Sequence, residues 1–295
     1  MISMENITEL VRQIKDKKPK RILLQLPEGL NKSAVQIVEA IEKEGIKVFL
    51  SAEPCYGACD LPITDINTDM IVHVGHNKFY KNIKTSVPVL YFPWTISVNI
   101  ENVDFSVIKE KRVGLITTVQ HLNALEHVSA LLKDAGKVPV KGGQILGCWT
   151  ENAEKIKDCV DAFLFIGSGS FHPLGLKGKK VYSLNLEKNK IEDIGTKKME
   201  KKRFANIYKC KDAKSFGILV STKPGQAGLE KSEKIKAELE KKHKKAFIVI
   251  MNEISSDKLL GIGVDAFINT ACPRLTDNCF DKPIINAEDL KIVLE

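Results

Sequence analysis

The sequence predicts an α/β protein with three pseudo-symmetric domains, each a small, mostly parallel sheet flanked by helices, around a central cleft. Two observations lead to this prediction. Apolar strands alternate with amphipathic helices, and the order strand, helix, strand, strand occurs three times. Strands that read as nearly continuous Ile, Val, Leu and Phe are typical of parallel sheets covered on both faces.

Each copy begins with a basic residue and an apolar strand, and ends with an apolar strand led by aspartate. The expected first strands are Arg21–Gln25, Val113–Thr117 and Phe216–Val220. The expected helices are Asn31–Glu44, His121–Asp134 and Leu229–Lys244. The expected second strands are Val48–Ser51, Val138–Val140 and Ala246–Ile250, and the Asp-led third strands are Asp69–Gly75, Asp161–Gly167 and Asp265–Thr270. The basic residue and the aspartate lie about 50 residues apart in every copy, a regularity that indicates an internal repeat.

This repeat places the domains near residues 1–106, 107–206 and 207–295, with the Lys-rich run Lys197–Arg203 expected to be a solvated linker at the second boundary. The alternative is one doubly wound sheet in which the spacing is a coincidence. The repeated order of elements favours three domains.

Composition indicates a globular protein of 295 residues, of which 43% are hydrophobic and 28% charged. No apolar run approaches the length of a membrane span, and the N-terminal segment lacks the apolar core of a signal peptide. We therefore expect a cytoplasmic protein without a membrane partner. Its seven cysteines are expected to be reduced thiols, for which metal binding or catalysis is a better interpretation than disulfides.

The net charge of +8 is compatible with nucleic-acid binding. However, the lysines lie mostly on the expected helical faces, without the interleaved aromatic residues on which single strands stack. An RNA-binding module therefore rests on charge alone, and we expect no direct nucleic-acid partner.

Three cysteines, Cys59, Cys148 and Cys272, each follow an expected strand in a different copy. In open α/β sheets, ligands bind outside the carboxyl ends of the strands, so all three lie on the ligand-binding side. Cys59 and Cys148 follow second strands, whereas Cys272 follows a third strand, where it corresponds to His76 and Ser168 of the other copies.

Thiolates hold iron–sulfur clusters, and three of them around a four-iron cluster leave one iron open for substrate. The alternative is that each cysteine is a small buried hydrophobic residue, and we interpret Cys159 and Cys210 in this way. Cys55 and Cys279 stay open, because neither Cys55-x-x-x-Cys59 nor Cys272-x6-Cys279 has the spacing of a zinc knuckle or a bacterial ferredoxin. Spacing alone establishes no cluster.

Motifs from about residue 20 to residue 276 resemble those of the archaeal diphthamide biosynthesis enzymes, the 2-(3-amino-3-carboxypropyl)histidine synthases. The three cysteine motifs are Tyr56-Gly57-Ala58-Cys59-Asp60, Gly143-Gln144-Ile145-Leu146-Gly147-Cys148 and Thr270-Ala271-Cys272-Pro273-Arg274-Leu275. The further matches are Leu26-Pro27-Glu28-Gly29-Leu30, Val74-Gly75-His76, Phe171-His172-Pro173-Leu174-Gly175 and Ser221-Thr222-Lys223-Pro224-Gly225-Gln226.

The resemblance implies a homodimer that carries a [4Fe-4S] cluster on Cys59, Cys148 and Cys272 in each chain. It further implies S-adenosylmethionine as substrate, an electron donor that the sequence does not identify, and cleavage of the Cγ–S bond of the methionine moiety. The 3-amino-3-carboxypropyl group then goes to a histidine of translation elongation factor 2, and 5'-methylthioadenosine is released. Because the family's first motif matches Cys59, Cys55 is left out of the ligand set.

The other motifs are expected to contact S-adenosylmethionine. The residues concerned are Pro27, Glu28, Gly29, Gly75, His76, Ser168, Gly169, Lys223 and Gln226. The turns after the first strands lead into helices and offer N–H groups to an anion such as the methionine carboxylate. Glu28 is a candidate acceptor for the α-amino group or the ribose. Lys223 is a candidate to form an ion pair with the carboxylate. Both residues are equally well interpreted as solvent-facing residues at a helix start. His172 is interpreted as a hydrogen-bonded structural histidine.

Two other functions stay in view. A quinolinate synthase-like enzyme also has three similar α/β domains and three cysteines, but the motifs at Thr270–Leu275 and Phe171–Gly175 favour the diphthamide enzymes. A non-catalytic accessory subunit that carries a cluster is the second alternative, and retention of all three cysteines favours catalysis.

Overall fold

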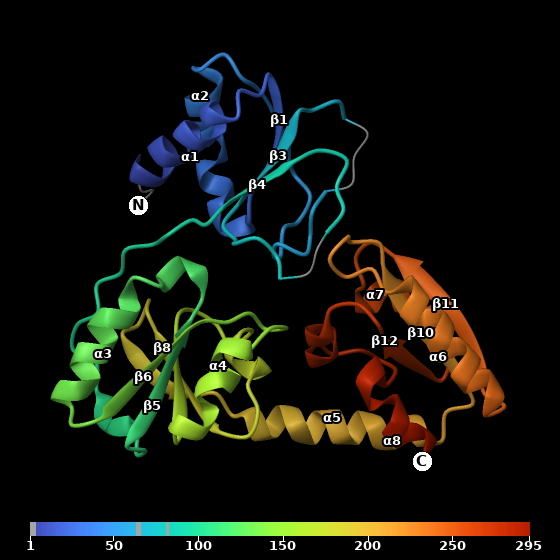
Figure 1. Ribbon diagram of the computed structural model, residues 1–295. Helices are drawn as coiled ribbons and strands as arrows, with labels where there is room; N and C mark the ends of the chain where they lie inside the picture. The colour runs from blue at the N-terminus through green and yellow to red at the C-terminus, as the bar shows by residue number, and fades with distance from the viewer. Residues whose placement is uncertain (1–3, 63–65, 81–82) are drawn as a thin grey trace. The chain divides into compact units, whose positions relative to one another are not determined.

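The computed structural model of the chain describes residues 4–62, 66–80 and 83–295 (Figure 1). The α-helices are α1 Met4–Asp16, α2 Ala34–Glu42, α3 Ala124–Asp134, α4 Glu151–Ile156, α5 Thr196–Lys211, α6 Leu229–Lys241, α7 Ser256–Leu259 and α8 Leu290–Leu294. The strands are β1 Arg21–Gln25, β2 Lys47–Ser51, β3 Met70–Val74, β4 Val89–Phe92, β5 Arg112–Thr117, β6 Val138–Gln144, β7 Ala162–Ile166, β8 Lys180–Asn185, β9 Lys190–Asp193, β10 Ser215–Ser221, β11 Lys245–Met251, β12 Ala266–Asn269 and β13 Ile284–Asn286. No helix in the described part of the chain is long and apolar enough to cross a membrane.

Three sheets share one strand order. Their orders are β2-β1-β3-β4, β6-β5-β7-β8-β9 and β11-β10-β12-β13. In each, the second strand of the repeat lies at an edge, and the first and third strands are neighbours. The β8–β9 pair is antiparallel, whereas the pairs of the first and third sheets are parallel. The prediction of mostly parallel sheets in three copies is confirmed, while the domain boundaries stay a prediction.

The chain divides into two compact units. Unit 1 comprises Met1–Asn99, Thr117–Glu126 and Lys223–Gly225, and unit 2 comprises Ile100–Ile116, His127–Thr222 and Gln226–Glu295. Unit 1 contains the first sheet, and unit 2 contains β6 to β13 and nearly all of β5.

The first sheet has α1 and α2 packed next to each other against it (Figure 1). Helix α1, which the sequence did not predict, buries Ile7, Leu10 and Ile14 at helical spacing. These side chains join the apolar residues of β1 and β3 in one core, so α1 completes the helical cover of the sheet.

In unit 2, the run Lys197–Arg203 lies within helix α5 and is not irregular; its exposed residues Lys198, Glu200, Lys201 and Arg203 agree with the expected solvation. Lysine and glutamate are good helix formers, and the second half of α5 buries Ile207 and Cys210 in the core of the third sheet. The Arg203 Nε atom donates to Asp289 Oδ1 at 3.0 Å, which fastens the helix to residues near the C-terminus.

The aspartate that leads the third strand has the same role in every copy. Its carboxylate accepts N–H groups at the start of the first strand. The bonds to Oδ2 come from Lys20 (2.6 Å) and Arg21 (2.8 Å) to Asp69, from Arg112 (3.0 Å) to Asp161, and from Lys214 (3.0 Å) and Ser215 (2.8 Å) to Asp265. The repeated aspartate therefore joins two neighbouring strands at their amino ends, opposite the ends from which the cysteine loops leave.

Candidate cysteine site

The loop that carries Cys59 follows β2 in unit 1, and Gly225 packs directly against it. The Gly225 N–H donates to the Cys59 carbonyl oxygen at 3.0 Å. A Cβ on Gly225 would lie 2.5 Å from both Cα and Cβ of Cys59, far inside van der Waals contact. Only glycine allows this approach, which gives Gly225 a structural role that the sequence interpretation did not assign.

Next to Cys59, Asp60 forms a buried ion pair with Lys223. The Lys223 Nζ atom lies 2.6 Å from Asp60 Oδ2, and the two side chains are only 8% and 9% exposed. The same ammonium group lies 4.7 Å from the centre of the Tyr56 ring. The structure therefore places Lys223 against the Cys59 loop, and its binding of S-adenosylmethionine stays a prediction.

A buried polar chain leads from the Cys59 loop to His76. Gln25 Nε2 donates to the Asp60 carbonyl at 2.7 Å, and Gln25 Oε1 lies 2.7 Å from His73 Nδ1. His73 Nε2 lies 3.0 Å from His76 Nδ1. Burial lowers the pKa of His73 to about 3 and that of His76 to about 4, so both rings are neutral near pH 7.

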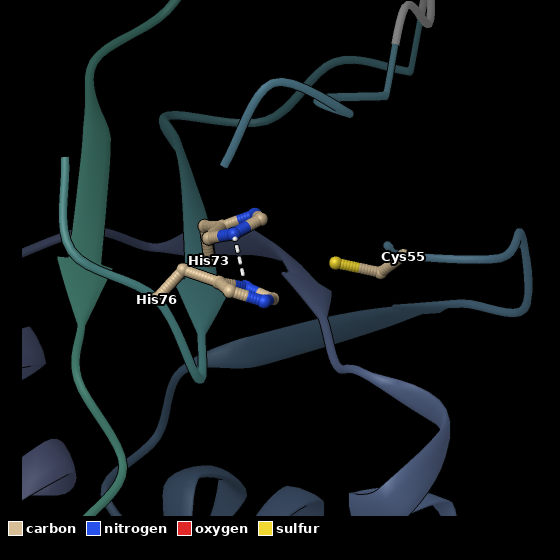
Figure 2. Close-up of side chains that lie close together, drawn as sticks. All are labelled: Cys55, His73 and His76. Atoms are coloured by element: carbon tan, nitrogen blue, oxygen red, sulfur yellow. Dashed lines mark hydrogen bonds between the residues drawn. The ribbon is translucent and has the colours of Figure 1, made fainter. Parts of the chain in front are cut away.

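Cys55 lies beside these two histidines (Figure 2). Its Sγ atom and one ring nitrogen of each histidine lie within 4.8 Å of one another. Burial raises the pKa of the Cys55 thiol to about 12. The sequence interpretation left Cys55 open and did not single out His73, which lies in an otherwise apolar strand.

Unit 2 holds the other two cysteines, each half-buried, and their motifs adjoin, because a Cβ on Gly147 would lie 3.3 Å from Arg274 Cγ. Burial is the largest cause that raises the pKa of Cys272, and the charge of the nearby Cys148 raises it further. The structure thus brings together two of the three predicted ligands, which come from different sheets.

The Cys148 loop is supported by the segment Phe171–Gly175. The Gly147 N–H donates to His172 Nδ1 at 3.1 Å, so His172 is hydrogen-bonded as predicted. A Cβ on Gly175 would lie 2.6 Å from the Gly147 carbonyl oxygen, so this position also requires glycine. The Arg274 guanidinium lies 5.6 Å from the centre of the Phe171 ring. The second and third cysteine motifs therefore pack on the same segment.

The Cys272 loop is held by two asparagines that the sequence interpretation missed. Asn269, which is 2% exposed, donates from Nδ2 to the Cys272 carbonyl at 2.8 Å and accepts from the Ala271 N–H at 3.0 Å. Asn286 Nδ2 donates to the Pro273 carbonyl at 3.0 Å. These bonds fix the backbone on both sides of the thiol.

A cavity of about 470 Å³ opens beside Cys148 in unit 2, a size suited to a small organic ligand. Groups of both charges line it: Lys202, Arg203, Arg274, Glu200, Asp277 and Asp289. Arg274 pairs with Asp277, yet its Nε atom is buried without a hydrogen-bond partner among the described residues. Arg274 therefore lines the cavity with a side chain whose Nε atom is buried and has no hydrogen-bond partner among the described residues.

Comparison with known proteins identifies the family. Residues 26–295 match the family described as "Putative diphthamide synthesis protein". The chain belongs to this diphthamide synthesis family. It is 32% identical to the 2-(3-amino-3-carboxypropyl)histidine synthase of Pyrococcus horikoshii, over 97% of this chain and 89% of that protein. It is 30% identical to the synthase of Methanocaldococcus jannaschii, over 100% of this chain and 90% of that protein.

Solved structures agree with this membership in the diphthamide synthesis family. The crystal structure of Dph2 from Pyrococcus horikoshii matches with a TM-score of 0.85 at 32% identity, over 98% of this chain and 90% of that chain. A second crystal structure, of the same protein with a 4Fe-4S cluster, matches with a TM-score of 0.84 over the same shares. The α/β fold of the family is therefore shared.

In this family member, the remaining predicted ligand contacts lie at the ends of strands. Pro27 is half-buried after β1, while Glu28 and Gly29 are exposed. Gly75 follows β3, and its carbonyl accepts from Gln120 Nε2 at 2.5 Å. In unit 2, Ser168 and Gly169 are exposed after β7, and Gln226 is half-buried in the loop after β10.

The cysteines outside the predicted ligand set differ in burial. Cys210 is buried in the core of the third sheet, as predicted. Cys159 is exposed, so its interpretation as a buried hydrophobic residue was wrong. It ends the short 3-10 helix Lys157–Cys159, and the chain enters the core at the next residue, Val160, which is 0% exposed. Cys279 is exposed as well.

Proposed function

We propose that this chain is a 2-(3-amino-3-carboxypropyl)histidine synthase, a transferase that carries out the first step of diphthamide biosynthesis. The observation that carries the proposal is that a similar chain, aligned over 98% of this one, holds a 4Fe-4S cluster. Here, Cys59, Cys148 and Cys272 are all half-buried in loops at the carboxyl ends of strands, where α/β sheets bind ligands.

The residues fit a cluster in their chemistry and in their support. Thiolates are the donors that iron–sulfur clusters require. Each of the three cysteines lies in a loop held by buried contacts, from Gly225 at Cys59, from Gly175 at the residue before Cys148, and from Asn269 at Cys272. We assign these three cysteines as the cluster ligands; Cys159 and Cys210 are excluded by their positions on the surface and in the core. When bound, the cluster supplies the electron that cleaves the Cγ–S bond of S-adenosylmethionine.

The mixed charges of the cavity suit the methionine end of that substrate, which carries a carboxylate and an ammonium group. Arg274 lines the cavity and supplies a guanidinium group for the carboxylate, and the Phe171 ring lies 5.6 Å from that group. Asp277 and Glu200 lie in the same cavity and provide acceptors for the ammonium group. Pro27, Glu28, Gly29, Gly75, His76, Ser168, Gly169, Lys223 and Gln226 stay the further proposed contacts.

The 3-amino-3-carboxypropyl radical adds to an imidazole carbon of a histidine in translation elongation factor 2, with 5'-methylthioadenosine as the other product. The imidazole becomes aromatic again when it loses one proton to solvent and one electron, which offsets the electron spent on the Cγ–S bond, so the overall transfer is redox-neutral. The first electron comes from a separate one-electron donor. We further propose that the chain acts as a homodimer in the cytoplasm.

Anaerobic reconstitution with iron and sulfide, followed by dithionite reduction and addition of S-adenosylmethionine, tests the proposal. We expect 5'-methylthioadenosine from the wild type and from Cys279→Ala, whose thiol is exposed. Cys59→Ala, Cys148→Ala and Cys272→Ala are each expected to lose both the product and the cluster spectrum. A fully loaded wild type that releases no 5'-methylthioadenosine would overturn the enzymatic assignment and favour an accessory subunit.

A further inference from the structure

Beyond the three ligand cysteines, unit 1 contains a second group of metal-binding side chains. Cys55 lies in the loop after β2, His73 lies in β3, and His76 follows that strand. Figure 2 shows the sulfur of Cys55 directed at the two imidazole rings. Cys55 and His73 are buried, and His76 is half-buried. The three donors therefore converge in a part of the molecule that excludes most water.

The hydrogen bonds define the protonation of both rings. The Asp60 carbonyl can only accept, so the Gln25 amide turns its Nε2 toward Asp60 and its Oε1 toward His73. His73 Nδ1 must then carry the proton, which leaves a lone pair on Nε2. His76 Nδ1 consequently donates to that lone pair at 3.0 Å. His73 thus presents a neutral imidazole nitrogen to the centre of the group, oriented from behind by Gln25, as an outer hydrogen bond orients a metal ligand.

The distances suit one tetrahedral ion. Zn–N bonds of about 2.0 Å and Zn–S bonds of about 2.3 Å place the donors of a tetrahedral site roughly 3.3 to 3.6 Å apart. His73 Nε2 and His76 Nδ1 are 3.0 Å apart, and Cys55 Sγ and one ring nitrogen of each histidine lie within 4.8 Å of one another. Side-chain adjustments of about an ångström therefore close the site.

We propose that Cys55, His73 and His76 form a second metal site that binds one divalent cation of the zinc class, separate from the cluster cysteines. A thiolate with two imidazoles is a donor set for zinc and cobalt(II), and three protein ligands leave a fourth position for water.

Binding of the metal ion changes the protonation of two side chains and involves no oxidation or reduction. The ion displaces the proton of the Cys55 thiol, which goes to solvent. The proton on His76 Nδ1 leaves and one returns to Nε2, so that Nδ1 becomes a ligand. One proton is released for each ion bound, and binding strengthens as pH rises.

Metal analysis of the cluster-loaded full-length chain tests the site, because the cluster occupies the other thiols. After one equivalent of Zn²⁺ and gel filtration, we expect one zinc per wild-type chain, and the same for Cys159→Ser, an exposed matched thiol. Cys55→Ser and His76→Gln are expected to lose the zinc and keep the iron, with an unchanged circular dichroism spectrum. X-ray absorption at the zinc edge of the wild type is expected to show one sulfur near 2.3 Å and two nitrogens near 2.0 Å.

The proposal would be overturned by a wild type that binds no zinc, or by zinc retained in both Cys55→Ser and His76→Gln. Loss of iron together with zinc in Cys55→Ser would also overturn it, because Cys55 would then be a cluster ligand. Gln25→Leu removes only the group behind His73 and is expected to weaken zinc binding by about 10- to 100-fold in a chelator competition. An unchanged affinity in that variant would contradict the assigned orientation of the ring. This proposal does not depend on the enzymatic activity.

Discussion

Lys223→Met removes the positive charge of the buried ion pair beside Cys59 while keeping most of the volume of the side chain. The Lys223 and Asp60 side chains are 8% and 9% exposed, and their charged atoms lie 2.6 Å apart. Breaking such a pair from one side costs about 3–5 kcal/mol, because the remaining carboxylate stays buried without a counter-charge. The loss of the ammonium contact with the Tyr56 ring adds roughly 0.5–2 kcal/mol. We expect unit 1 to lose about 3 kcal/mol or more of its free energy of unfolding.

The two tryptophans make the loss measurable in the right part of the chain. Trp94 is buried in unit 1, and Trp149 belongs to unit 2. In a Trp149→Phe background, urea unfolding followed by fluorescence reports on the surroundings of Trp94 alone. This separation is needed because a chain with several domains does not unfold in one step.

A double-mutant cycle with Asp60→Asn supplies the control. The combined variant carries no buried charge, so we expect it to be more stable than Lys223→Met alone, with a coupling energy of roughly 2 kcal/mol or more. A loss below about 1 kcal/mol in the single variant is what an exposed pair shows. That result would refute the reasoning that this pair organises the Cys59 loop from inside the protein.

Two further predictions concern the same loop and its neighbours. Gly225→Ala forces a methyl group against Cys59, and we expect it to lower the free energy of unfolding by about 1–3 kcal/mol and to lower the iron content after reconstitution. The control is Gly261→Ala, where a Cβ meets nothing within 4 Å, and we expect it to change neither quantity. Equal iron content in the two variants would contradict the close approach of Gly225 to Cys59. In metal-free protein, stability is expected to fall as pH drops from about 6.5 toward 4, because His73 and His76 bind protons readily only after unfolding. The free energy of unfolding is expected to change by at most about 1.4 kcal/mol per pH unit for each histidine. A midpoint of urea unfolding that stays constant over this pH range would exclude buried neutral rings.

The periodic parts of the fold were predictable from sequence, and the parts held by long-range packing were not. The three expected first strands agree with β1, β5 and β10 to within one residue at each end. Helix α5 was missed because its many lysines leave only a short apolar face, which gives a weak helical pattern in the sequence. Ile207 and Cys210 on that face are buried. That face becomes visible only when the third sheet is in place to cover it.

The candidate site shows the same division. The three cysteine motifs are local in sequence and were found by resemblance, but the residues that support them are not. Gln25, His73 and Asn269 are single polar residues in otherwise apolar strands. From the sequence alone, each is predicted only to be part of a buried strand, with no role of its own. Their role depends on partners up to 48 residues away, as for His73 and Gln25, and no local pattern records such a pairing.

The contact between residues 223–225 and the Cys59 loop has a consequence for how the chain matures. The ion pair joins residues 163 positions apart, so the first sheet emerges from the ribosome long before its cysteine loop can be completed. At synthesis rates of about 5–20 residues per second, the delay is roughly 8 to 33 s. During that time Cys59 belongs to an unfinished loop that lacks Gly225 and Lys223. With Cys59 as a proposed cluster ligand, we expect cluster insertion to follow synthesis of β10 and of residues 223–225.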